Sequence, residues 1–100
     1  MDALLTKIKA SIRITHDKLD ADVTDTIDAC LADLRVAGLR AEKLDTTQEL
    51  DPLILNAVKL YCKSEYTDDQ VKAAAYRQRY DALKACLGVA GEYKEAAADE

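Results

Sequence analysis

The sequence has few residues that interrupt helices and few that favour strands. It contains one proline, three glycines and five tyrosines, with no phenylalanine or tryptophan. Proline and glycine weaken helices, whereas aromatic residues are enriched in strands. The composition therefore predicts an all-α fold whose core is built from Leu, Ile, Val and Ala.

Cysteine and histidine are also scarce, which excludes the usual metal sites. Cys30, Cys62 and Cys86 are odd in number and lack CxxC spacing, and His16 is the only histidine. Each cysteine falls on or beside an apolar helical stripe, so we expect reduced core residues rather than reactive thiols. We predict no metal and no cofactor.

Catalytic and membrane-spanning signatures are missing as well. The sequence has no glycine-rich phosphate loop, no GxSxG, no HExxH and no run of 18 apolar residues. No basic segment followed by an apolar run opens the chain, which predicts a protein made in the cytoplasm. We expect a protein that is not an enzyme, has no catalytic residue and binds no membrane.

The net charge of −5 is concentrated at the two ends of the chain. Residues 92–100 carry four acids and one base, and residues 1–39 carry seven acids and five bases. Duplex DNA binding requires clustered Lys and Arg, so nucleic acid is a poor first candidate as a direct partner.

Apolar periodicity predicts about four helices. In the clearest, over residues 23–39, apolar side chains share one stripe and Gly38 takes the position after the C-cap. A first helix is expected over residues 2–12, and Asp51 followed by Pro52 predicts the start of a central, well-buried helix. Thr67 with Gln70 resembles a capping box for a last helix that ends at Gly88.

The last helix carries two apolar stripes. Tyr76, Tyr80, Leu83 and Leu87 form one, and Val71, Ala75, Ala82 and Cys86 form the other. One stripe satisfies a monomer, so the second indicates a partner, although alanines also let a helix approach its own neighbours closely. The basic residues Arg77, Arg79 and Lys84 are the nearest approach to a functional cluster, and the simpler alternative is a solvated face.

We divide the chain into a helical domain over residues 1–91 and a flexible acidic tail over residues 92–100. The tail has little to bury, since Tyr93 is its single aromatic residue.

Two blocks then resemble a known family. LLTKIKASIRIT with DTIDACLADLRVAGL, and YRQRYDALKACLGVAGEYK near the end, resemble the small head-tail connector (adaptor, or DNA-packaging) proteins of long-tailed bacteriophages and prophages. The resemblance implies a helical bundle that forms a ring of about a dozen copies under the portal and extends the DNA channel.

The implied partners are the portal protein, a tail-side completion protein and other copies of this chain, with DNA only passing through the channel. The implied location is the head-tail interface of the virion. The residues expected to contact another subunit or the portal lie on the last helix and just beyond it: Val71, Lys72, Ala75, Arg77, Arg79, Lys84, Val89, Tyr93 and Lys94.

Two other functions stay open at this point. The first is a small helical regulatory module that binds one protein through the same helix face. The second is a nucleic-acid binder, for which the basic residues would be Lys72, Arg77, Arg79 and Lys84.

Overall fold

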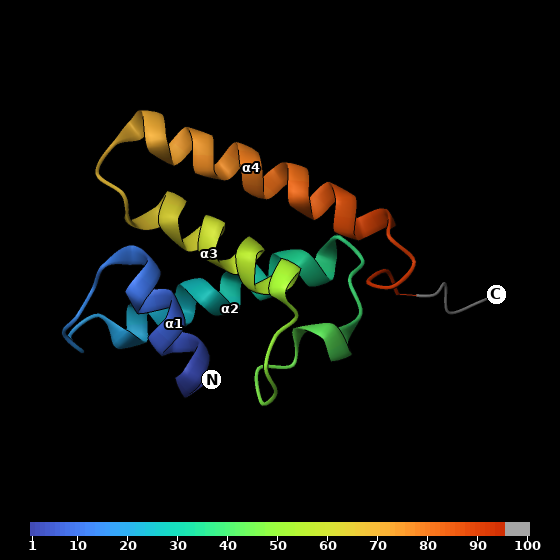
Figure 1. Ribbon diagram of the computed structural model, residues 1–100, viewed down its shortest axis with the longest axis horizontal. Helices are drawn as coiled ribbons and strands as arrows, with labels where there is room; N and C mark the ends of the chain where they lie inside the picture. The colour runs from blue at the N-terminus through green and yellow to red at the C-terminus, as the bar shows by residue number, and fades with distance from the viewer. Residues whose placement is uncertain (96–100) are drawn as a thin grey trace.

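The computed structural model describes residues 1–95 of the chain (Figure 1). Its elements are α1 (Asp2–Ile12), α2 (Asp20–Val36), the 3₁₀ helix η1 (Ala41–Leu44), α3 (Pro52–Tyr66) and α4 (Gln70–Val89). Residues 1–95 contain no strand, only an isolated antiparallel bridge between Leu39 and Lys94. The prediction of an all-α bundle of about four helices is confirmed.

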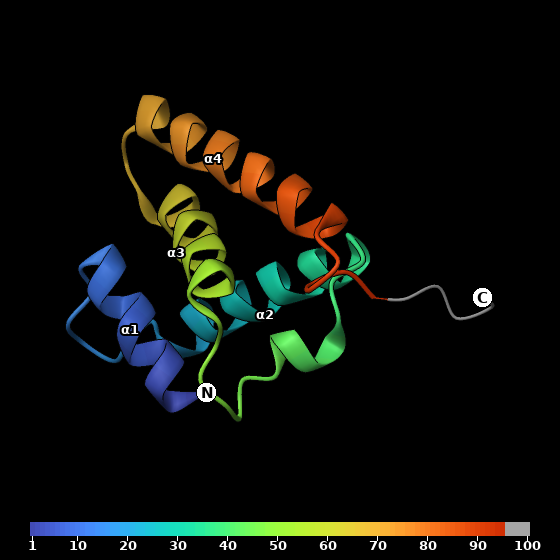
Figure 2. The same cartoon turned by 45° about the vertical axis from the view of Figure 1, so that its right-hand side comes forward.

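Helix α3 lies at the centre of the bundle and packs against α1, α2 and α4. Helix α4 runs along α3 and forms one side of the molecule, as the two views in Figures 1 and 2 agree. The ends of α1 and α3 meet the start of α4 at one end of the molecule. At the other end, the C-terminus of α2 meets the end of α4 and the segment that follows it (Figure 1).

Two helix boundaries follow from capping residues that were predicted. Asp51 accepts a hydrogen bond from the Leu53 N–H at 2.8 Å, and Pro52 occupies the first helical position of α3. Gly38 has φ +103°, and beyond it the Leu39 N–H donates to the Leu34 carbonyl at 3.2 Å. Both predictions are confirmed.

The boundaries of α4 differ from the prediction. Thr67 is the C-cap of α3, and Asp69 caps α4 by accepting from the Val71 and Lys72 N–H groups at 2.9 and 3.2 Å. The carboxylate satisfies two free N–H groups, so it displaces the expected capping box. At the other end Gly88 continues the helix, which ends at Val89.

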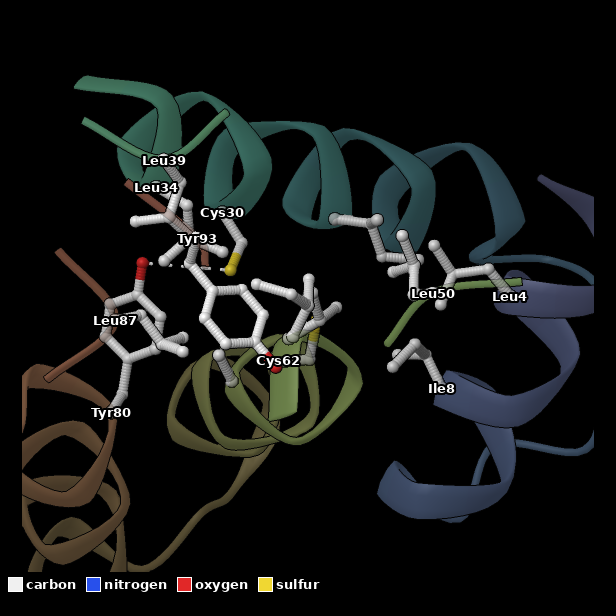
Figure 3. Packing of buried hydrophobic residues seen from close by; sticks show 14 of the residues in the cluster. Leu4, Ile8, Cys30, Leu34, Leu39, Leu50, Cys62, Tyr80, Leu87 and Tyr93 are labelled. Atoms are coloured by element: carbon white, nitrogen blue, oxygen red, sulfur yellow. Dashed lines mark hydrogen bonds between the residues drawn. The ribbon is translucent and has the colours of Figure 1, made fainter. Parts of the chain in front are cut away.

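One contiguous apolar core joins the four α-helices, and Leu44 of η1 packs against it (Figure 3). Its buried members are Leu4, Ile8, Val23, Ile27, Cys30, Leu34, Leu39, Leu50, Ile54, Ala57, Val58, Cys62, Tyr80, Leu87 and Tyr93. The predicted core stripe of α4 is confirmed, with Tyr80 and Leu87 buried and Tyr76 and Leu83 half-buried.

The cysteine prediction is confirmed for two of the three residues. Cys30 and Cys62 are buried, and burial raises the pKa of each thiol to about 12. Cys86 is exposed. The prediction was wrong for Cys86 because this residue lies on the side of α4 that no other helix covers.

The acidic tail was expected to begin at residue 92, but residues 92–95 pack onto the helices. Tyr93 is buried, and the Arg40 N–H donates to the Tyr93 carbonyl at 2.8 Å. The expectation failed here because one aromatic ring and a short backbone pairing fasten the segment. For residues 96–100 the expectation lies outside the described part of the chain.

Over residues 1–95, none of the helices combines the length and the apolar character that a membrane crossing requires. In the same part of the chain, no three His, Cys, Asp or Glu side chains are grouped in a way that could hold a metal ion.

Candidate functional site

The outer face of α4 is an apolar surface that the bundle leaves exposed. We define this face by its exposed apolar residues: Val71, Ala74, Ala82, Ala85, Cys86 and Val89. Val71 is 80% exposed and Val89 is 78% exposed, at opposite ends of the helix. A helix normally turns its apolar stripe towards a partner, so this face can bind a protein surface.

The end of α4 lies against the end of α2. Gly88 of α4 lies so close to the backbone at the end of α2 that a Cβ atom on Gly88 would be 3.3 Å from the Ala37 carbonyl oxygen. Val36, next to Ala37, is 87% exposed, and Val89 follows Gly88. Val36 and Val89, both exposed, are therefore the sequence neighbours of the two residues at which α2 and α4 come closest.

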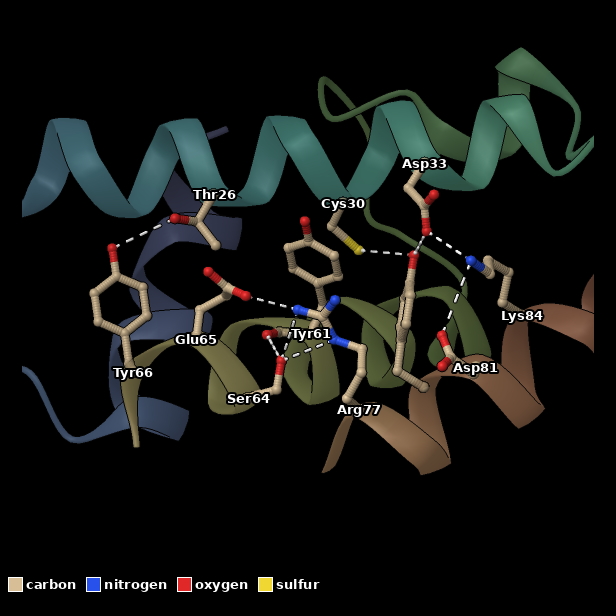
Figure 4. Close-up of polar contacts among 11 residues, drawn as sticks. Thr26, Cys30, Asp33, Tyr61, Ser64, Glu65, Tyr66, Arg77, Asp81 and Lys84 are labelled. Atoms are coloured by element: carbon tan, nitrogen blue, oxygen red, sulfur yellow. Dashed lines mark hydrogen bonds and ion pairs between the residues drawn. The ribbon is translucent and has the colours of Figure 1, made fainter. Parts of the chain in front are cut away.

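The inner edge of α4 is a polar network that joins it to α2 (Figure 4). The buried Tyr80 hydroxyl accepts from the Cys30 thiol at 3.8 Å and donates to Asp33 Oδ2 at 2.7 Å. Lys84 Nζ donates to the same Asp33 oxygen at 3.0 Å. Burial raises the pKa of the Tyr80 hydroxyl and the hydrogen bond to Asp33 raises it further, whereas that bond and Lys84 lower the pKa of Asp33.

Arg77 belongs to the same inner edge. Its guanidinium lies 4.5 Å from the centre of the Tyr61 ring and donates to Ser64 Oγ and to Glu65 Oε2, the latter at 2.7 Å (Figure 4). The rings of Tyr61 and Tyr80 meet edge to face, with their centroids 5.1 Å apart. Arg77 thus closes the α3–α4 interface through stacking and charge-assisted hydrogen bonds.

The predicted contact residues therefore separate into different surroundings. Arg77 and Lys84 are half-buried and pair with carboxylates of α3 and α2, and Ala75 is half-buried. The exposed members are Val71, Lys72, Arg79, Val89 and Lys94. Val71 and Val89 share the outer face of α4, whereas Lys94 lies with the C-terminal segment.

Tyr93 is the predicted contact residue whose surroundings differ most from expectation. Its ring is buried, its hydroxyl donates to Asp51 Oδ1 at 2.8 Å, and Lys43 Nζ lies 5.2 Å from the ring centre. The hydrogen bond to Asp51 is the main reason that the pKa of Tyr93 is raised to about 12. Tyr93 anchors the C-terminal segment within its own subunit.

Further contacts around Tyr93 complete a C-terminal clasp, which we define as residues 91–95. The Glu95 N–H donates to the Gly38 carbonyl at 2.7 Å, and Arg35 Nη2 lies 2.8 Å from Glu95 Oε1. The sequence analysis missed this clasp. The signal that could have found it is one aromatic residue in a segment otherwise poor in large apolar residues, because such a residue gains most from burial.

Comparison with known protein families gives one finding for this chain. Residues 4–94 match the family model described as "Phage connector protein". The matched range includes all of η1, α2, α3 and α4, most of α1, and the clasp through Lys94. No curated protein and no solved structure matches the chain.

Proposed function

We propose a function on the premise that this chain belongs to the phage connector protein family, to which residues 4–94 match. The protein is a structural component of the phage head-tail connection. Within that role, it assembles as a ring beneath the portal, extends the channel for DNA and completes the head for tail attachment. Its partners are the portal protein above, a tail-side completion protein below and copies of itself at each side.

The outer face of α4 is the observation that supports a ring. Helix α4 covers α3 with one side and leaves Val71 and Val89 almost fully exposed on the other. A ring needs a surface on each subunit that its neighbours cover, and an apolar helix face without a partner suits this use. The charged residues that remain exposed beside it, Lys72 and Arg79, can contribute to the rim of the contact.

The charge of the protein agrees with DNA as passing cargo. The chain has a net charge of −5, and like charges repel DNA, so an acidic channel wall lets it slide without binding. The residues offered for direct DNA binding are partly neutralised, since Arg77 pairs with Glu65 and Lys84 pairs with Asp33. This pairing favours a connector over a nucleic-acid binder.

The test is to mix the chain with portal rings of the same phage and to image the product by electron microscopy. We expect a second ring of density beneath the portal. A portal ring without added density at saturating protein concentration contradicts the proposal. A defined dimer that forms with or without portal, in place of added density, favours a regulatory module instead.

A matched pair of variants assigns the contact to α4. Val71→Asp with Val89→Asp places two carboxylates on the outer face and should reduce ring density strongly while the protein stays folded, because both residues are exposed. Ala21→Asp with Ala29→Asp also adds two carboxylates, at exposed positions of α2, and should assemble normally. Equal assembly of both variants excludes the outer face as the contact.

A further inference from the structure

A basic hollow lies at the end of the molecule where α1, α3 and the start of α4 meet. Its volume is about 260 Å³, and its lining residues are Ser11, Ile12, Arg13, Lys63, Tyr66, Thr67, Lys72 and Tyr76. Three of these are cations and none is a carboxylate. Two other hollows, by contrast, include acidic side chains, Glu49 in one and Glu92 in the other.

The cations of the hollow have no ionic partner among residues 1–95. Seven of the fourteen Lys and Arg side chains pair with carboxylates in the described structure, and Arg13, Lys63 and Lys72 are not among them. The acid nearest to Lys72 along the chain, Asp69, turns its carboxylate to the N–H groups that open α4, and the acid nearest to Lys63, Glu65, pairs with Arg77. Lys63 Nζ lies 5.7 Å from the centre of the Tyr76 ring, and none of the three cations pairs with a carboxylate within residues 1–95. Three positive charges without a carboxylate partner around one cavity favour an anionic ligand.

The same chain carries an acidic segment at its opposite end. Glu95 is held beside the C-terminus of α2 by Arg35, and Asp99 and Glu100 follow it in the sequence. Lys72, the cation of the hollow that lies on α4, is 17 residues before Val89, which is about 26 Å of helix. Five extended residues after Glu95 span at most about 18 Å, which is shorter than this stretch, so a neighbouring copy is the better source of the acidic side chains.

We propose that the hollow formed by Arg13, Lys63 and Lys72 binds the acidic side chains that follow the clasp, Asp99 and Glu100, of a neighbouring copy of this chain. Complementary features at opposite ends of one molecule give a head-to-tail contact, and repetition of such a contact closes a ring when the rotation between subunits allows it. This inference rests on the proposed function, for which it supplies a second contact besides the outer face of α4.

A second macromolecule with the same charge, DNA, fits the hollow less well. Phosphates of a duplex follow one another along a continuous track, and their binding requires basic residues spread along that track. Here the three cations surround a single cavity whose volume suits one or two carboxylate side chains. The acidic segment supplies such side chains in every copy.

The first test measures binding of a fluorescent peptide with the sequence of residues 95–100 to the full chain by anisotropy. We expect binding that weakens as salt rises, and a loss of about tenfold in affinity for the variant Lys63→Gln with Lys72→Gln. The matched control, Lys18→Gln with Arg79→Gln, also removes two cations that are unpaired among residues 1–95, but outside the hollow, and should bind within about twofold of the parent.

Two results of this test overturn the inference. One is equal peptide affinity in both double variants. The other is displacement of the peptide by a short DNA duplex whose own affinity falls in the Lys63→Gln, Lys72→Gln variant, because the hollow would then be a phosphate site.

A second test identifies the subunits that are joined. A carbodiimide couples amines to carboxylates in contact, and a mixture of ¹⁴N- and ¹⁵N-labelled chains separates contacts between copies from contacts within one. We expect mixed-isotope products that link Lys63 or Lys72 to Asp99 or Glu100. Their absence at high protein concentration, while the internal pair Lys84–Asp33 is coupled, overturns the inference.

The two proposals fail separately. If the peptide does not bind but ring density appears beneath the portal, only the contact proposed here is wrong. If the peptide binds and the isotope-mixed products form without any density on the portal, the head-to-tail contact stands and the connector function fails.

Discussion

The inner edge of α4 and its outer face carry similar kinds of residue in opposite surroundings. Both have cations and apolar groups, but Arg77 and Lys84 on the inner edge are bound to carboxylates of α3 and α2. On the outer face, Val71 and Val89 are 80% and 78% exposed, and the neighbouring Arg79 has no ion pair within residues 1–95.

This difference separates the residues of α4 that hold the fold from those that the proposed ring contact would use. A substitution on the inner edge leaves a buried ring or a paired charge without its partner, so it costs folding free energy before any assembly is reached. A substitution on the outer face changes only what the subunit presents to others. The predictions that follow use this division, from the largest expected effect to the smallest.

Tyr80→Ala should cause the largest loss of stability. Tyr80 is 1% exposed and packs edge to face against Tyr61, so removal of the ring leaves a cavity and should lower the free energy of unfolding by about 3–5 kcal/mol. Urea denaturation followed by circular dichroism measures this change. Tyr76→Ala, at a half-buried position of the same helix, should lower the free energy of unfolding clearly less. Similar losses for both variants would contradict the special importance of the buried position.

Tyr80→Phe keeps the ring and removes only the hydroxyl. Loss of its hydrogen bond to the Asp33 carboxylate should cost about 1–2 kcal/mol at neutral pH. Denaturation at pH 7 measures this loss, and a value near zero would show that the hydroxyl network contributes nothing.

The same variant should change how stability depends on pH. The raised pKa of Tyr80 means that the folded protein keeps its phenolic proton at a pH where the unfolded chain releases it. Stability is therefore complete below about pH 10 and falls as pH rises above it. Denaturation between pH 8 and about pH 11 should show a shallower decline for Tyr80→Phe, which keeps the contributions of Tyr61, Tyr66 and Tyr93. An unchanged decline of stability in this variant would show that the decline arises from those three tyrosines alone.

Charge reversal at two nearby arginines gives a direct comparison of the two sides. Arg77→Glu places a carboxylate beside Glu65 and removes the guanidinium from the Tyr61 ring, which should cost about 1–2 kcal/mol. Arg79→Glu is exposed and should stay within about 0.5 kcal/mol of the parent. Thermal unfolding measures both, and equal effects would contradict the assignment of Arg77 to the inner edge.

Thiol reactivity should distinguish the exposed face of α4 from the core without any loss of stability. Cys86 is exposed and should react readily with a thiol reagent in the folded protein, whereas Cys30 and Cys62 are buried and should react only after unfolding. Counting labelled cysteines by mass spectrometry before and after denaturation measures this. Cys86→Ser should abolish the fast reaction, and fast labelling of that variant would show that the core opens easily.

Much of the fold could be predicted because its signals are local in the sequence. The end of α2 at Gly38 and the start of α3 at Asp51 depend on residues within one helical turn, and the stripe of Tyr80 and Leu87 repeats at helical spacing. The predicted capping box at Thr67 was wrong, because the Asp69 carboxylate accepts from two free N–H groups and helix α4 begins after Asp69 instead.

The candidate site could be predicted only in part. Helical spacing placed Val71 on the second stripe, and the fold left it exposed. The same spacing could not show that Arg77 meets Glu65, or that Tyr93 returns to Asp51, because those partners come from other elements. The hollow that contains Arg13, Lys63 and Lys72 is likewise assembled from three helices.

The sequence by itself determined that the chain forms amphipathic helices with defined ends, because helical periodicity and capping act between residues a few positions apart. The tertiary structure alone decided which cations of α4 pair with carboxylates of their own chain and which stay exposed without such a pair within residues 1–95. It also decided that Tyr93 packs into the core. Those outcomes depend on contacts between residues 12 to 60 positions apart, such as Arg77 with Glu65 and Arg35 with Glu95. No local pattern encodes such pairs, because they form only when the helices pack.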